Sequence, residues 1–140
     1  WSDSGWFESK SSDMQFLIET GKKSAETYSF DIQSTTRMKI FDKNVATLNA
    51  MINWCHIRNI KVILLTPPAF TTYREHLDKK QLNITLDLAE RIALENDYCL
   101  YINLLNDDRF VLEDYWDADH LAEKGAKKLQ QALPDCKITF

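Results

Sequence analysis

Apolar residues recur every three or four positions between residues 37 and 58, namely at Phe41, Val45, Leu48, Ile52 and Cys55. Because an α-helix has 3.6 residues per turn, this spacing collects them on one stripe. The segment is therefore predicted to be an amphipathic helix that packs its stripe against a core. Residues 13–29 have a weaker helical pattern, which Gly21 interrupts, and residues 1–12 are polar and predicted as loop.

Two short segments have the pattern of buried strands. Ile60–Thr66 is rich in β-branched residues and almost continuously apolar, and it stops at Pro67 and Pro68. A run of this kind is typical of a parallel strand covered on both faces, and proline cannot donate to the hydrogen-bond ladder. Tyr98–Leu104 is predicted as the second strand.

Helical patterns connect and follow these strands. Residues 72–95 are predicted as a helix with a break near residues 77–79, and Thr72 and Glu75 have the spacing of a capping box. Residues 122–133 form the predicted final helix, with apolar or small residues every fourth position. The order is helix, strand, helix, strand, loop, helix, which predicts an α/β fold with a parallel sheet.

Two strands are too few for a sheet that is covered on both faces. Residues 1–36 are therefore interpreted as an N-terminal linker region of loop and weak helix, and residues 37–140 as the C-terminal part of an α/β domain. We expect a missing N-terminal segment or a second chain to complete the sheet.

Composition excludes several function classes. The 140-residue chain has a net charge of −4, and Lys124, Lys127 and Lys128 are interpreted as a solvated helix face, so nucleic-acid binding is not expected. Three cysteines without short spacing predict neither a disulfide framework nor a zinc site. No apolar run reaches the roughly 20 residues of a membrane span. No metal and no cofactor are predicted.

The stretch Asp117-Ala118-Asp119-His120-Leu121 carries the candidate chemistry. It lies in the loop after the second predicted strand, where the sites of open α/β sheets concentrate. A carboxylate three residues before a histidine can fold back to the imidazole and fix its tautomer, which leaves the other nitrogen to take a proton. The alternative is structural: Asp117 and Asp119 would be turn or capping residues and His120 a helix-start residue.

The same stretch resembles the SGNH (GDSL-type) hydrolase superfamily, in the bacterial branch with a D-x-D-H-L-x-x-x-G-A pattern that runs here from Asp117 to Ala126. The segment Lys61–Pro68 resembles the penultimate core strand of that family, and the likeness covers roughly residues 40–133. It implies a three-layer α/β/α, flavodoxin-like fold, seen here only as its C-terminal part. It also implies that His120 is the base of a Ser-His-Asp triad, that Asp117 orients it, and that Asp119 holds the loop or the helix N-terminus.

Two departures from the family matter. Ala122 replaces the usual capping residue, and no strand followed by Gly-Asp-Ser is present. Ser4 has only three residues before it, so no buried strand can present it as a nucleophile. The resemblance thus implies an ester hydrolase or O-acyl esterase or transferase that carries the Asp-His pair without its serine, and whose isolated chain is inactive.

Three functions remain open from the sequence. The first is the enzyme, with a small ester or O-acylated carbohydrate as substrate and Trp116 beside the pair as a substrate-binding residue. The second is a non-catalytic SGNH-like module that binds carbohydrate or protein. The third is a structural βαβ unit whose motif is coincidence. By resemblance alone, the location would be the bacterial cell envelope, the periplasm or outside the cell.

Overall fold

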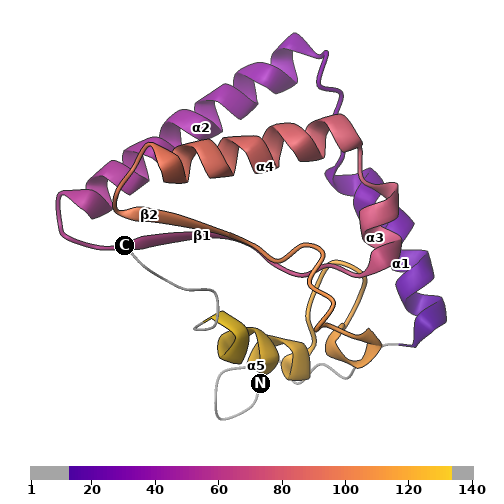
Figure 1. The fold of residues 1–140 in the computed structure, drawn as a ribbon. Helices are drawn as coiled ribbons and strands as arrows, with labels where there is room; N and C mark the ends of the chain where they lie inside the picture. Colours follow the sequence, from indigo (N-terminus) through magenta and orange to yellow (C-terminus); the bar gives the residue numbers. More distant parts are fainter. Residues whose placement is uncertain (1–12, 134–140) are drawn as a thin grey trace. The chain divides into compact units, whose positions relative to one another are not determined.

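The computed structural model describes residues 13–133, and Figure 1 shows their arrangement. The elements in chain order are α1 (Met14–Tyr28), α2 (Thr35–His56), β1 (Val62–Thr66), α3 (Thr71–His76), α4 (Lys79–Leu94), β2 (Cys99–Asn103), the 3-10 helix η1 (Leu112–Asp114) and α5 (Glu123–Ala132). These elements fall into two compact units. Among the described residues, one unit contains residues 13–28, Thr66–Leu77 and residues 103–133, and the other contains Ser29–Leu65 and Asp78–Ile102.

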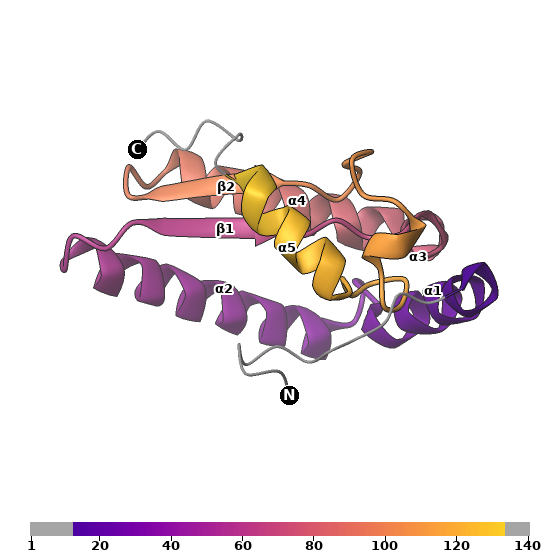
Figure 2. The same cartoon turned by 90° about the horizontal axis from the view of Figure 1, so that it is seen from below.

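The unit built on α2 and α4 contains the sheet. β1 and β2 lie side by side in parallel, as Figure 2 also shows, and the Val62 N–H donates to the Tyr98 carbonyl at 2.8 Å. The parallel pairing predicted from the apolar runs is confirmed. Burial alternates along β1, with Ile63 40% and Leu65 36% exposed, as expected for side chains that point to opposite faces of a sheet.

Both helices of this unit pack against the same apolar cluster. Its buried members come from α2, α4 and β2, and partly buried apolar side chains from α2, α4 and β1 surround them: Ile52, Ile92 and Cys99, then Leu48, Val62, Leu64, Leu88 and Ala93. Burial of such side chains stabilises a fold by about 1.5–3 kcal/mol each. The break predicted between the two connecting helices is also confirmed, because Asp78 caps α4 by accepting the Gln81 N–H at 2.7 Å.

The other unit is centred on Leu17, Phe110 and Tyr115. The weak helical pattern after residue 13 proves to be a continuous helix, α1, in which Gly21 is buried. A Cβ at Gly21 would lie 2.5 Å from Thr72 Oγ1, so this glycine allows α1 and α3 to approach closely. The interruption expected at Gly21 was therefore wrong: packing outweighs the low helix propensity of glycine.

Thr72 also has a different role from the one predicted. α3 begins after Phe70 and has no side-chain cap, so the predicted capping box at Thr72 is wrong. Its hydroxyl instead donates to the Leu17 carbonyl at 2.6 Å, which joins α3 to α1. Within residues 13–133, no helix combines the length and the apolar character needed to cross a membrane.

Candidate active site

The loop between η1 and α5 is closed by backbone links at its base. The Ala122 N–H donates to the Asp114 carbonyl at 2.8 Å, Tyr115 and Leu121 form an antiparallel bridge, and the Trp116 N–H donates to the His120 carbonyl at 3.0 Å. These links make the segment a small hairpin with residues 117–119 at its tip. The side chains of the tip are therefore held on an ordered backbone.

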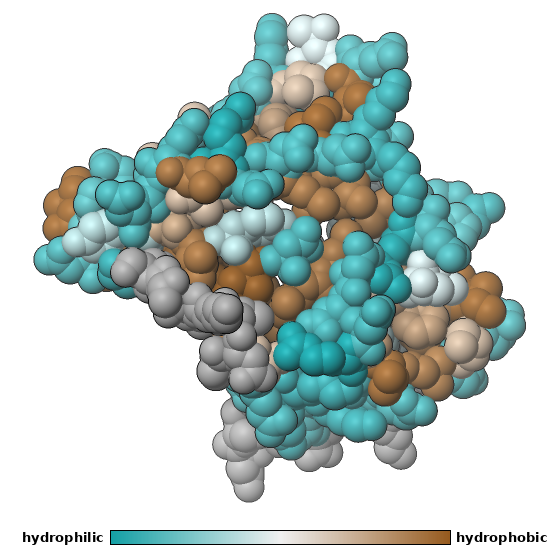
Figure 3. Space-filling view, viewed as in Figure 1, coloured by the Kyte–Doolittle hydropathy of each residue, from teal (hydrophilic) through white to brown (hydrophobic). Residues whose placement is uncertain are grey.

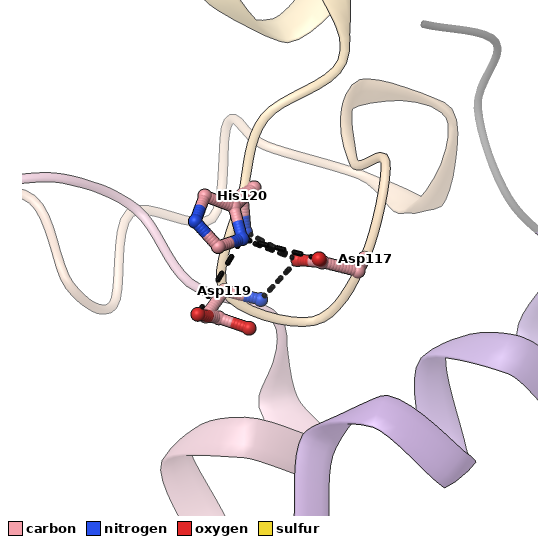
Figure 4. A group of neighbouring side chains, drawn as sticks. All are labelled: Asp117, Asp119 and His120. Carbon is pink, nitrogen blue, oxygen red and sulfur yellow. Dashed lines mark hydrogen bonds and ion pairs between the residues drawn. The ribbon is translucent and has the colours of Figure 1, made fainter. Parts of the chain in front are cut away.

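Asp117 organises this tip through its carboxylate. Oδ1 accepts the His120 backbone N–H at 2.7 Å and the Asp119 N–H at 3.1 Å, as an aspartate does when it caps a turn. The same carboxylate contacts the His120 ring, with Nδ1 2.9 Å from Oδ1 and 3.1 Å from Oδ2 (Figure 4). The Asp117 carboxylate thus satisfies two backbone N–H groups of the turn and also positions the imidazole of His120.

His120 presents its other ring nitrogen away from both carboxylates, as Figure 4 shows. The side chain is 55% exposed, whereas that of Asp117 is 15% exposed. The expected hydrogen-bond contact between Asp117 and one ring nitrogen of His120 is confirmed. An Nδ1–H donor to Asp117 leaves Nε2 with a lone pair, which is the state required of a general base.

Asp119 is a second carboxylate beside the same ring nitrogen. Its Oδ2 lies 3.4 Å from His120 Nδ1, and its side chain is 10% exposed. Burial raises the pKa of Asp119, a hydrogen bond from Ser24 on α1 opposes that rise, and the neighbouring Asp117 carboxylate adds to it. Burial, followed by the nearby Asp119, also raises the pKa of Tyr73. Asp119 was expected to hold the loop or to cap α5; α5 has no side-chain cap, so the capping role is wrong.

Ala118 fixes the tip of the loop to two helices. It is fully buried, its N–H donates to Thr20 Oγ1 of α1 at 3.2 Å, and its carbonyl accepts the Phe70 N–H before α3 at 2.8 Å. A larger side chain between Asp117 and Asp119 would have no room. The small residue inside the motif therefore has a packing reason.

Gly125 and Asp114 hold the base of the loop against α5. A Cβ at Gly125 would lie 2.1 Å from the Asp114 carbonyl oxygen, so only glycine permits this approach. Asp114 is fully buried and pairs with Lys128, whose Nζ also donates to the Arg109 carbonyl at 2.7 Å. The interpretation of Lys128 as part of a solvated face was wrong, because its ammonium group pairs with the buried carboxylate of Asp114.

Trp116 lies beside the pair and is 43% exposed. Its ring meets that of His120 edge to face, with centroids 6.2 Å apart. The neighbouring aromatic residue, Tyr115, is instead buried: it is 2% exposed, and burial raises its pKa to about 12. Tyr115 is thus a core residue, and Trp116 is the aromatic that is available to a ligand.

The same cluster is the group within residues 13–133 whose side chains could hold a metal ion. One ligand atom each from Asp117, Asp119 and His120 lie within 4.8 Å of one another. However, Asp117 Oδ1 already accepts two backbone N–H groups as well as facing Nδ1. A metal bound at Nδ1 would replace the contact of this nitrogen with the Asp117 carboxylate, so the arrangement fits an oriented imidazole better than a ligand set.

Comparison with protein-family models, curated proteins and solved structures found no match. Sequence reasoning identified Asp117, His120 and Trp116, but it missed the contact of Asp119 with the ring and the part played by α1. Ser4, which was not expected to act as the nucleophile, lies outside the described residues.

Proposed function

We propose that this chain supplies the orienting carboxylate and the general base of a Ser-His-Asp site for ester hydrolysis or acyl transfer, in a fold of the SGNH type. The observation that carries the proposal is the 2.9 Å contact between Asp117 Oδ1 and His120 Nδ1, with Nε2 accessible on an exposed ring. A base needs an orienting group behind it and open space in front of it, and this pair has both.

The proposed chemistry follows from the roles of the two ring nitrogens. Asp117 holds the proton on Nδ1, and Nε2 takes the proton of a serine hydroxyl as the serine oxygen attacks the ester carbonyl carbon. The imidazolium that forms returns this proton to the departing alkoxide, which leaves an acyl-serine. Water or an acceptor hydroxyl then attacks the acyl group with the same proton transfers. The serine would come from a polypeptide segment other than residues 13–133.

The substrate class we propose is a small ester or an O-acylated carbohydrate. The exposed ring of Trp116 offers an apolar surface next to His120 on which a sugar ring could lie. Because Asp117 and Asp119 place negative charge beside the ring, a neutral ester suits this site better than an anionic one.

The exposed Trp116 also favours a second function, which is carbohydrate binding without catalysis. The two functions differ in their dependence on His120. Titration of the chain with acetylated and deacetylated oligosaccharides would separate them. Binding without turnover in the protein that contains both this chain and a serine-bearing segment would favour the second function.

Parallel sheets are normally covered on both faces, and Ile63 and Leu65 leave one face of β1 exposed. We propose that further strands and helices, from another segment or a second chain, complete a three-layer sheet here. Ile63→Lys should then destabilise the completed protein by about 2 kcal/mol more than it destabilises the 140-residue chain. Equal effects in both would contradict the completed sheet.

Hydrolysis of aryl esters tests the catalytic proposal. The 140-residue chain should hydrolyse them no faster than its His120→Ala variant, because within residues 13–133 no serine hydroxyl is a hydrogen-bond partner of the His120 ring. In a protein that carries this chain together with the nucleophile, His120→Ala should lower kcat by several orders of magnitude. His76→Ala, at an exposed histidine on α3, is the matched control and should have no effect. Esterase activity that survives the loss of His120 would end the proposal.

A further inference from the structure

The helix α2 has apolar side chains on two sides. One stripe, which includes the buried Ile52, packs against the sheet. A second set faces outward, with Ile40 49%, Met51 61% and Trp54 52% exposed. These three positions are separated by 11 and 3 residues, or about three turns and one turn of helix, so they share one side. The outward set is not part of the core cluster.

The exposed apolar character continues beyond the carboxyl end of α2. Ile57 is 70% exposed and Ile60 is 44% exposed, and Figure 3 shows an apolar group over this end of α2 among hydrophilic neighbours. The Arg58 guanidinium stacks 3.9 Å over the Trp54 ring. Aromatic and apolar side chains mixed with the long basic side chains of Lys and Arg are typical of the boundary between water and lipid.

Charge is concentrated on the same segment. Between Thr35 and Lys61 there are five basic side chains and one acidic side chain, whereas the rest of the chain has 12 basic and 20 acidic ones. All five are exposed: Arg37, Lys39, Lys43, Arg58 and Lys61. They form no continuous run in the sequence, because no two of them are adjacent.

We propose that the outward side of α2 and the turn after it bind an anionic lipid surface. We call this the α2 surface and define it by its apolar and basic members, which are Arg37, Ile40, Lys43, Met51, Trp54, Ile57, Arg58, Ile60 and Lys61. The apolar members would enter the headgroup region, and the basic members would contact lipid phosphates. Charge complementarity selects this occupant, because the segment is basic within an acidic chain and its apolar groups are spread along a helix and not gathered in a pocket.

Vesicle flotation with the 140-residue chain tests the proposal. Binding should be strong to vesicles of mixed phosphatidylcholine and phosphatidylglycerol, weak to phosphatidylcholine alone, and weaker at high salt because salt screens the charges. Arg58→Gln with Lys61→Gln should reduce binding by about tenfold or more. Met51→Gln with Trp54→Gln should reduce it similarly without any change in charge.

Matched variants elsewhere provide the controls. Lys23→Gln with Lys124→Gln removes two exposed charges far from α2 in sequence, and Leu94→Gln removes an apolar side chain that is 80% exposed on α4. Neither should change vesicle binding, and circular dichroism should show every variant folded. Equal binding to neutral and anionic vesicles, or an equal loss in the controls, would overturn the proposal. So would self-association that needs Met51 and Trp54 in a chain that binds no vesicles, because the surface would then be a protein interface.

Discussion

Replacement of Gly125 by alanine should loosen the candidate site without touching its functional groups. The added Cβ would lie 2.1 Å from the Asp114 carbonyl oxygen and 3.0 Å from Leu121 Cδ2. Because relaxed carbon–oxygen contacts lie at about 3.3 Å or more, the backbone would have to move by about 1 Å. That movement would break the hydrogen bond from the Ala122 N–H to the same carbonyl, which closes the loop.

The expected cost follows from three terms. Overpacking costs about 1–3 kcal/mol and the lost hydrogen bond costs about 1 kcal/mol, while alanine in place of glycine in a helix returns about 1 kcal/mol. The net destabilisation is about 2 kcal/mol, which corresponds to roughly 30-fold faster exchange of the loop amides. Hydrogen exchange measured at the His120 and Ala122 amides tests this. Lys124→Ala, at the exposed neighbouring position, is the control and should leave both amides unchanged. Unchanged protection in Gly125→Ala would refute the packing argument.

Other predictions concern contacts that hold or tune the site. Thr72→Val should cost about 1 kcal/mol in urea unfolding, because it removes the hydroxyl that donates to the Leu17 carbonyl at nearly constant volume; a neutral result would contradict this. Lys128→Met should cost about 3–5 kcal/mol by leaving the Asp114 carboxylate buried and unpaired, and adding Asp114→Asn should recover part of that loss; no recovery would contradict the pairing. Since burial raises the pKa of Asp119, its charge disfavours folding, and this penalty grows as pH rises from about 3.9 towards the raised value. Asp119→Asn should therefore gain stability relative to the natural chain over that window in urea titrations, and parallel pH profiles would contradict it.

The fold could be predicted as far as local pattern specifies it. The helix expected over residues 37–58 is observed at Thr35–His56, since a long stripe at helical spacing needs no distant contact to be recognised. Both strands were placed within two residues for a similar reason. Gly21 could not be understood this way, because its value lies in the approach of α3, which is 50 residues further along the chain.

In the candidate site too, a contact between residues close in sequence could be predicted, and contacts that depend on helix packing could not. The contact between Asp117 and His120 spans three residues within one turn, so the sequence was sufficient to predict it. The roles of Ser24 and Thr20 depend on how α1 packs, and no pattern near residue 117 reports them. The pairing of Lys128 with Asp114 likewise joins a helix face to a loop. Helical periodicity alone predicted that this lysine is solvent-exposed, because it contains no information on the loop.

The tautomer of His120 tests the central claim most directly. Nitrogen-15 NMR of the 140-residue chain, at a pH where the ring is neutral, reports which ring nitrogen carries the proton. If Asp117 orients the ring, the proton should be on Nδ1 in the natural chain and in Asp119→Asn, because Asp117 is the nearer carboxylate at 2.9 Å against 3.4 Å. Asp117→Ala should release the ring to a mixture of tautomers. A proton on Nε2 in the natural chain, or the same spectrum after loss of Asp117, would contradict the assignment of His120 as an oriented base.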